Sequence, residues 1–422
     1  MEKILLSIVM IIFTGGIIHI LSKKYKLDKN QLVIFWMLVL FWTSISVIRA
    51  YRKVYAIDPV NSGGLGSSAV IAAQITSAYG LISCIVRLPI FFLTDIFKKR
   101  KIFIQLAILF MIITSLLVFL KPSVNTLYYS SLAMGLCASM LAIFNVMFSE
   151  TFDTKSATVS ASILSTAPLL AEFMAAPIQY IGTYSTIKNY NILWLFSCII
   201  ACITFILSLK MKEIKNNTKF SLKKVYVVLS NTRFITICIV AIIISFVKFS
   251  TSGPNMIVYA RKYLNMPAIM LAYLDTMFAT PQLIASVLVG TYFKNKFGIE
   301  KTLLLSLGSF LCFYSIILFT NNPYLAFFSY IFNGFGYGGT YVSLIAIALQ
   351  YFEKENRNIS MGIFQGFFAF GIFFGDRVYV WLAKHLNANP KSIFMLVTTV
   401  TIISMIVVFI RLVMRKGVRN EK

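Results

Sequence analysis

The sequence predicts an all-α membrane protein built from two six-helix bundles, with one extra hydrophobic helix at the N-terminus. The first observation is composition: 59% of the 422 residues are hydrophobic, 13% are charged, and the mean hydropathy is +0.82. A soluble domain is about a quarter charged. The second observation is an internal repeat, in which Arg49 matches Lys248 and Gly135 matches Gly334 at one common offset. We therefore expect the two bundles to be related by pseudo-twofold symmetry.

Apolar runs of about 20 residues, the length that crosses a hydrocarbon core of about 30 Å, divide the chain into its expected helices. The twelve clearest runs are 31–56, 66–94, 102–120, 125–149, 157–184, 190–209, 234–259, 267–293, 302–320, 323–351, 359–383 and 393–414. A thirteenth run, 4–21, precedes them. It is followed by Ser22, Lys23 and Lys24, which do not form a signal-peptide cleavage site. We expect an extra membrane helix, and a helix that lies in the membrane interface is the alternative.

The longest polar link, residues 210–233, separates the two bundles and is too rich in lysine to cross a membrane. The expected domain plan follows from it. The expected parts, in chain order, are an extra helix with a basic link (1–30), the first bundle (31–209), a cytoplasmic linker (210–233), the second bundle (234–414) and a cytoplasmic tail (415–422).

Lys and Arg residues gather in the links on one side of the predicted membrane, including 22–30, 98–101 and 210–233. Because cytoplasmic loops carry the excess of basic residues, that side is expected to be the cytoplasm. The C-terminus then lies inside as well. Abundant Lys, Asn and Ile indicate an AT-rich, bacterial genome, so the plasma membrane is the expected location.

The same placement of charge argues against nucleic acid as a partner, although the net charge is +25. The six cysteines all fall within apolar runs and lack metal-ligand spacing. The chain carries no HExxH motif, P-loop or nucleophile elbow. We expect neither a metal nor another cofactor, and no enzymatic activity.

Two links resemble a signature of the major facilitator superfamily, G-x-x-x-D-R-x-G-R-R. The link after the second expected helix reads TDIFKKRK at residues 94–101, and the link after the eighth reads GTYFKNKFGIEK at residues 290–301. The first copy has Phe91 in place of the leading glycine, and the second has Lys294 in place of the acid. With the twelve runs, the central linker and the repeat, residues 31–414 are similar to that family. The resemblance implies a single-chain secondary transporter that opens to each side in turn.

In that family these links latch helices together on the cytoplasmic side, and the resemblance implies the same role here. The residues expected in the two latches are Asp95, Lys98, Arg100, Gly290 and Lys294. A carboxylate at a helix end can accept hydrogen bonds from basic side chains or a helix N-terminus. Asp95 is therefore expected to pair with Lys155 or Arg87. The alternative is that the basic cluster only fixes the topology.

A narrower resemblance concerns the organophosphate/phosphate exchanger branch. Three segments are similar to that branch: VIR at 47–49, SAYG at 77–80 and VKF at 247–249. There, one basic residue from the first helix and one from the seventh hold the phosphate, and Arg49 and Lys248 fall on those positions. The branch has Arg where this chain has Lys, which lacks the two-pronged fork. Its second-helix Lys falls near Ser83, about one turn from Arg87. The implied substrate is a small organic anion, phosphorylated or not.

Charged side chains inside membrane helices usually face a cavity or a partner. Lys248 is expected to line the central cavity, and pairing with an acid is the alternative. Arg49 lies nearer the outer end of its run, so its alternative is an interface anchor. Arg377 is expected to be a third base of the cavity. Three tyrosines are expected to bind the substrate, with ordinary packing as the alternative: Tyr79, Tyr337 and Tyr341.

Two carboxylates within the runs are candidates for proton coupling. Glu172 lies between Pro168 and Pro177, and Asp275 lies near Pro281. Because a buried carboxyl group can take up a proton, both are expected to couple transport to protons. The alternative is a structural ion pair with a base.

The sequence therefore predicts a secondary transporter whose partners are the lipid bilayer, a small anionic molecule, and a proton or a second anion as counter-substrate. One rival is a proton-coupled transporter or exporter of neutral or cationic molecules, in which Glu172, Asp275 and Asp376 face the cavity. A receptor or structural protein on the same fold and an integral membrane enzyme are the other rivals.

Overall fold

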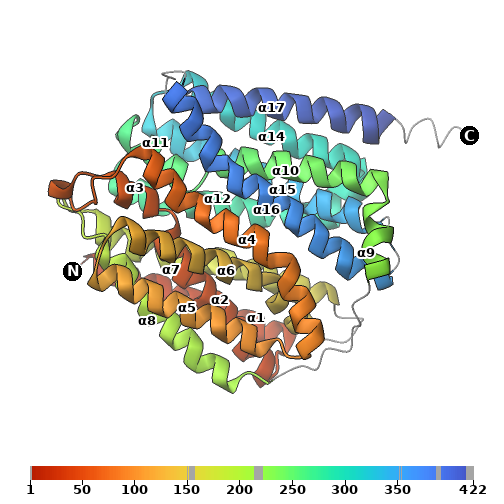
Figure 1. Ribbon diagram of the computed structural model, residues 1–422, viewed down its shortest axis with the longest axis horizontal. Coiled ribbons are helices and arrows are strands. Elements are labelled where there is room, and N and C mark those ends of the chain that lie inside the picture. Colours follow the sequence, from red (N-terminus) through yellow and green to blue (C-terminus); the bar gives the residue numbers. More distant parts are fainter. Residues whose placement is uncertain are drawn as a thin grey trace, which may run out of the picture. The chain divides into compact units, whose positions relative to one another are not determined.

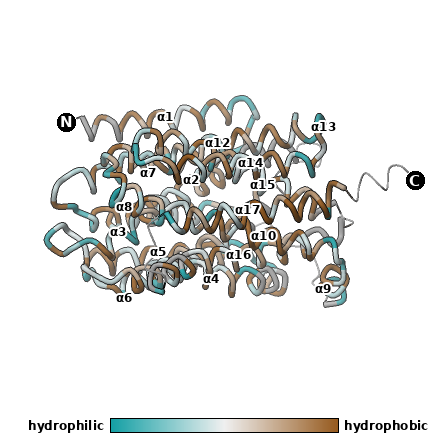
Figure 2. The backbone as a smooth tube through the Cα atoms, turned by 90° about the horizontal axis from the view of Figure 1, so that it is seen from above, coloured by the Kyte–Doolittle hydropathy of each residue, from teal (hydrophilic) through white to brown (hydrophobic). Residues whose placement is uncertain are grey.

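The structure, a computed structural model, describes residues 2–149, 151, 157–212, 222–350, 352, 354–385 and 391–414. Throughout that part of the chain the regular elements are all helices (Figure 1), which confirms the predicted fold class. Nine of the helices described are long and apolar enough to cross a membrane. Hydrophobic residues run along the helices, and hydrophilic residues gather in the links (Figure 2).

The chain divides into two compact units. Unit 1 contains Met1–Phe220 and Pro267–Thr276, and unit 2 contains Ser221–Met266 and Met277–Lys422. The helices of the first segment of unit 1 are α1 (Glu2–Tyr25), α2 (Lys29–Arg49), α3 (Arg52–Ile57), α4 (Ala69–Phe97), α5 (Lys101–Leu120), α6 (Val124–Ser149), α7 (Ala157–Thr183) and α8 (Asn191–Lys210), with a 3₁₀ turn η1 (Val60–Ser62). The extra helix expected at the N-terminus is α1, which packs against α7.

Unit 2 has a similar succession of helices. They are α9 (Leu222–Leu229), α10 (Thr232–Thr251), α11 (Pro254–Lys262), α12 (Ala268–Leu288), η3 (Val289–Phe293), α13 (Lys294–Phe297), α14 (Ile299–Phe319), α15 (Pro323–Gln350), α16 (Lys354–His385), α17 (Ser392–Val408) and η4 (Phe409–Met414). The first residues of α12 group with unit 1, and the remainder groups with unit 2.

Polar side chains fix where several helices begin. Asp28 accepts a hydrogen bond from the Gln31 backbone at 2.7 Å, and the Gln31 side chain accepts one from the Asp28 backbone at 2.9 Å. This reciprocal capping box satisfies two backbone N–H groups at the start of α2. Asn231 caps α10 by accepting a hydrogen bond from the Phe234 backbone at 3.0 Å. These caps set the register of the two helices that carry Arg49 and Lys248.

The first long span of each unit is broken, although the sequence predicted one continuous run in each case. Residues 31–56 are split between α2 and α3, and residues 234–259 are split between α10 and α11. In unit 2 the break falls at Gly253, whose φ of +57° suits glycine, and Pro254 then starts α11. The prediction from run length missed both breaks, although Gly253 and Pro254 are adjacent break signals in the sequence of unit 2.

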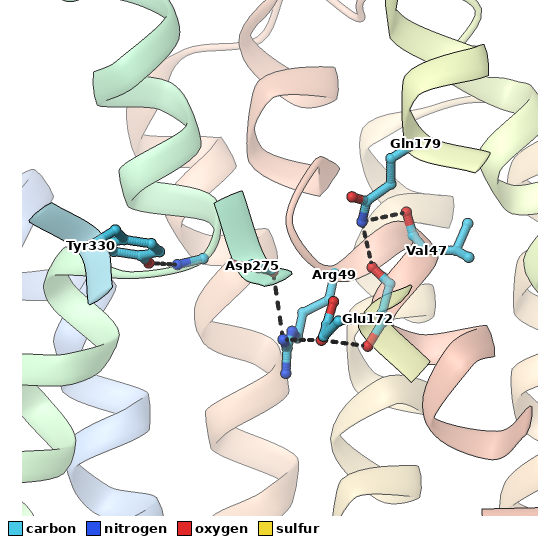
Figure 3. A network of polar contacts seen from close by, with 8 residues as sticks. Val47, Arg49, Glu172, Gln179, Asp275 and Tyr330 are labelled. Atoms are coloured by element: carbon cyan, nitrogen blue, oxygen red, sulfur yellow. Dashed lines mark hydrogen bonds and ion pairs between the residues drawn. The ribbon is translucent and has the colours of Figure 1, made fainter. Parts of the chain in front are cut away.

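Side chains from neighbouring helices form hydrogen bonds with backbone C=O or N–H groups near each break. In unit 1, the Gln179 amide donates to the carbonyl oxygens of Ser46 at 2.8 Å and Val47 at 3.4 Å (Figure 3). In unit 2, the Tyr330 hydroxyl accepts a hydrogen bond from the Gly253 N–H at 3.4 Å. Because unbonded backbone groups are costly in an apolar interior, these side chains stabilise the broken helices.

The internal repeat extends to the packing of the helices. A Cβ atom at Gly135 of α6 would lie 2.4 Å from the carbonyl oxygen of Tyr79 in α4, and one at Gly334 of α15 would lie 2.1 Å from the carbonyl oxygen of Phe278 in α12. Tyr79 and Phe278 are separated by the same offset as the two glycines. Each unit therefore uses a glycine at the matching position to bring two helix backbones together.

Candidate functional site

Arg49, at the end of α2, is held by two carboxylates within unit 1. Its Nη2 atom lies 2.9 Å from Oε1 of Glu172 and 3.5 Å from Oδ2 of Asp275. Ser46 donates a further hydrogen bond of 2.7 Å to the same oxygen of Glu172. Figure 3 shows Arg49 between the two acids. We refer to Ser46, Arg49, Glu172 and Asp275 as the Arg49 group.

The secondary structure explains how these side chains meet. Ser46 and Arg49 are three residues apart on α2 and therefore share one face of that helix. Glu172 lies on α7, and Asp275 lies on the part of α12 that groups with unit 1. Both acids are buried, with exposed fractions of 5% and 6%. Buried charges need partners, and the guanidinium supplies one to each acid.

The two ion pairs differ in strength. The contact between Arg49 and Glu172 has the length of a charge-assisted hydrogen bond, whereas 3.5 Å to Asp275 is longer than a normal hydrogen bond. Glu172 is thus the main partner and Asp275 the looser one. The ion pair that the sequence offered as the alternative role of Glu172 is present. A proton-coupling role for the two acids stays a prediction.

Lys248, which matches Arg49 in the repeat, lies among aromatic rings within unit 2. Its Nζ atom is 4.0 Å from the ring centre of Phe249, 4.9 Å from that of Tyr337 and 5.1 Å from that of Phe278. These distances allow cation–π attraction, which offsets part of the cost of burying an ammonium group. The side chain is 9% exposed. We refer to Lys248 and these rings, with the further rings that continue from Tyr337, as the Lys248 group.

The rings continue from Lys248 along α15 to α16. Tyr337 and Tyr341 are stacked at 5.7 Å with an interplanar angle of 20°, and the ring of Tyr341 lies 5.2 Å from that of Phe368. The Gln365 amide donates a hydrogen bond of 2.6 Å to the Tyr341 hydroxyl. Two of the predicted tyrosines therefore lie in one group with Lys248.

The other two predicted binding residues are Tyr79 and Arg377. Tyr79 is buried, interacts electrostatically with Arg49, and has the guanidinium carbon of Arg52 at 5.1 Å from its ring centre. Arg377 is exposed on α16 and lies over the ring of Phe373 at 4.4 Å. The joint action of Arg49 and Lys248 on one anion stays a prediction, as does the third base.

The residues expected in the latches have varied surroundings. Lys98 is exposed and ends α4 in the left-handed conformation, whereas Arg100 is buried. Gly290 lies in the π-helical η3, and Lys294 is exposed at the start of α13. Lys155 and the side chains of Asp95 and Asp376 lie outside the described residues. The latch role stays a prediction.

Several residues in or beside the two groups were not singled out from the sequence. They are Ser46, Gln179, Phe278, Gln365 and Phe368. Ser46 carried one usable signal, because a hydroxyl three residues before Arg49 shares its helix face. The rings carried none, since phenylalanine is abundant throughout the chain, with 38 residues.

Comparisons with known proteins agree with this fold. A crystal structure of a point mutant of the nucleoside transporter NupG has a TM-score of 0.74 at 10% identity, covering 90% of this chain and 99% of that one. A POT family transporter in complex with a thioalcohol-conjugated peptide has a TM-score of 0.74 at 12% identity, covering 90% and 96%. A bacterial homolog of the human lysosomal transporter Spinster has a TM-score of 0.62 at 12% identity, covering 91% and 94%. No curated protein matches the sequence significantly.

The described helices are long and apolar enough to cross a membrane several times, and their fold is shared with these solved transporter structures. Residues 237–422 match the model of the Major Facilitator Superfamily. This match, which covers slightly less than half of the chain, supports the resemblance to that superfamily indicated by the two links.

Proposed function

We propose that the chain moves a small organic anion across the plasma membrane and couples that movement to protons. The observation that carries the proposal is the contrast between two matched bases. Arg49 is held by two buried carboxylates, whereas Lys248 is surrounded by aromatic rings. The Arg49 group is the proposed proton site, and the Lys248 group is the proposed anion site.

The Arg49 group suits proton binding because two carboxylates share one guanidinium. With both acids ionised, the three charged side chains carry one net negative charge in a buried setting. Adding one proton leaves a single acid paired with Arg49 and removes the net charge. Asp275, the looser partner at 3.5 Å, is the acid whose protonation disturbs the ion pairs least. A proton can thus bind without breaking the shorter contact between Arg49 and Glu172.

The Lys248 group suits an anion because it places a buried positive charge beside aromatic rings. An anionic substrate would gain a charge-assisted contact with the ammonium group. A ligand shifts the equilibrium between two conformations only through contacts that differ between them. Binding at Lys248 supplies such a contact on unit 2, and proton binding supplies one on unit 1.

The orientation proposed for the chain places the C-terminus in the cytoplasm. The basic links, including residues 22–30 and 98–101, support this orientation because Lys and Arg are enriched in cytoplasmic loops.

Transport by proteoliposomes that contain a pH-sensitive dye tests the proposal. The panel contains carboxylates, sugar phosphates, nucleosides and organic cations. We expect a proton gradient to drive accumulation of one or more of the anions, and Lys248→Gln to abolish it. Lys262→Gln is the matched control, because Lys262 is an exposed lysine of α11 in the same unit.

Two outcomes contradict the proposal. Accumulation of only neutral or cationic compounds would favour the rival in which Glu172 and Asp275 recognise the substrate. Anion transport that is unchanged in Lys248→Gln would reject the anion site.

A further inference from the structure

We infer that the transported anion is a flat aromatic carboxylate, whose ring stacks on the tyrosines beside Lys248 while its carboxylate contacts the ammonium group. This inference rests on the proposed function and names its substrate class. It comes from the geometry of Phe278, Tyr337, Tyr341 and Phe368, which form one row of rings within unit 2.

The row begins at the ammonium group and ends at α16. Phe278 lies 5.6 Å from Tyr337, Tyr337 lies 5.7 Å from Tyr341, and Tyr341 lies 5.2 Å from Phe368, measured between ring centres. Lys248 lies near the first two rings, at 5.1 and 4.9 Å. A ligand that follows this row therefore meets a positive charge at one end and ring faces beyond it.

Exposure distinguishes the rings that can meet a ligand from those that support them. Phe278 and Phe368 are 7% and 3% exposed and close the two ends of the row. Tyr337 and Tyr341 retain partial exposure between them. Gln365 holds the hydroxyl of Tyr341 through its hydrogen bond, which limits rotation of that side chain. The accessible part of the row is therefore the stacked pair Tyr337 and Tyr341, and Gln365 fixes the orientation of Tyr341.

The repeat shows that the fold does not require these tyrosines. The positions of unit 1 that match Tyr337 and Tyr341 are Ala138 and Ala142, at the same offset that relates Gly135 to Gly334. The glycines make the same close backbone approach in both units. Because the sequence has alanine at both matching positions of α6, the tyrosine pair is specific to unit 2.

Ring chemistry selects among anions. Aromatic rings attract one another in offset or edge arrangements at the separations seen in this row. A flat ring can join the row, whereas a puckered aliphatic ring makes fewer close contacts with the ring faces. Those faces are also electronegative, so they disfavour the second negative charge of a phosphate monoester. A monocarboxylate on an aromatic ring satisfies both conditions.

Competition for transport in proteoliposomes tests this inference with benzoate and cyclohexanecarboxylate, which share a carboxylate and a six-membered ring but differ in flatness. Phenyl phosphate tests the preferred charge. We expect benzoate to compete roughly three- to tenfold better than cyclohexanecarboxylate, the range that one aromatic contact gives. We expect phenyl phosphate to compete less well than benzoate.

The double variant Tyr337→Leu/Tyr341→Leu is expected to lose the preference for benzoate, so that the two acids compete equally. Tyr337→Phe should keep the preference, because the ring remains. Tyr324→Leu is the matched control, since Tyr324 is a 58% exposed tyrosine of the same helix. The thermal unfolding midpoint of each variant shows whether it is folded.

Equal competition by the two acids, or a preference that survives in the double variant, would overturn the inference and leave the proposed function intact. Stronger competition by phenyl phosphate would overturn the choice of a carboxylate. Absence of transport for every organic anion would instead defeat the proposed function itself.

Discussion

The Arg49 group and the Lys248 group occupy matched positions of the repeat but have different chemistry. In unit 1 the base is held by Glu172 at 2.9 Å and Asp275 at 3.5 Å. In unit 2 it lies 4.0 to 5.1 Å from the centres of three rings. The close helix approach at Gly135 and Gly334 is the same in both. The repeat thus preserves the position of the charge, while the residues around it differ, and this difference is the basis of the two roles proposed.

The broken helices show the same pattern of shared geometry and different chemistry. In unit 1 one amide, from Gln179, donates to two backbone carbonyls. In unit 2 the Tyr330 hydroxyl accepts from the Gly253 backbone, and Asn333 donates to the hydroxyl of Ser252 at 3.2 Å. Each unit meets the same backbone requirement with the polar residues available on its own neighbouring helix.

The largest expected effect comes from Glu172→Gln, which removes the main acid of the Arg49 group. We expect accumulation driven by a proton gradient to be lost, because Asp275 then becomes the only carboxylate of the group, pairs with Arg49 and keeps its charge. Exchange of labelled for unlabelled substrate should continue, because the Lys248 group is intact. Glu300→Gln is the control, since Glu300 is also a buried carboxylate but lies in the first turn of α14. Accumulation that persists in Glu172→Gln would remove the assigned difference between the two groups.

The glycine pair tests whether the shared geometry is equally important in both units. Gly135→Ala and Gly334→Ala each place a Cβ against a backbone oxygen, at 2.4 and 2.1 Å, so we expect each to cost about 1–3 kcal/mol of stability. Thermal unfolding in detergent measures this cost. Gly308→Ala in α14 is the control, because nothing lies within 4 Å of its added Cβ. A cost in one unit only would show that the repeat is not equivalent in packing.

Loss of the Gln179 amide should destabilise unit 1 more than loss of Asn333 destabilises unit 2. Gln179→Leu leaves two buried carbonyls without this donor, which costs about 1–3 kcal/mol. Asn333→Leu removes one hydrogen bond to a rotatable hydroxyl, which costs about 0.5–1.5 kcal/mol. Unfolding midpoints measured side by side compare the two, and the reverse order would contradict this account of the helix breaks.

The smallest expected effect concerns α1, the additional helix of unit 1. Phe13 makes an edge contact of 5.7 Å with Phe173, the residue after Glu172. Phe13→Leu keeps an apolar side chain but loses the ring contact. We expect this loss to lower the free energy of unfolding by about 0.5–1.5 kcal/mol. Unfolding experiments should show this small loss with transport unchanged. A large loss of proton coupling in this variant would instead make α1 part of the Arg49 group.

The sequence predicted the helical fold well because spans of the required length and apolarity are a strong signal. It also singled out Arg49, Lys248, Glu172 and Asp275, since buried charges are rare enough to stand out. It could not predict which acid meets which base, because that depends on the packing of helices distant in sequence. Nor could it single out Phe278 or Phe368, because an aromatic residue in a membrane helix is ordinary until its neighbours are known.

The most direct test of the two assigned roles is the dissociation constant of the transported anion, measured by calorimetry for Lys248→Gln and Glu172→Gln. The account predicts that Lys248→Gln weakens binding about tenfold or more, the effect of losing a contact to a charged group. It predicts that Glu172→Gln retains the affinity but no longer binds a proton together with the anion. Undiminished affinity in Lys248→Gln, combined with lost affinity in Glu172→Gln, would contradict it.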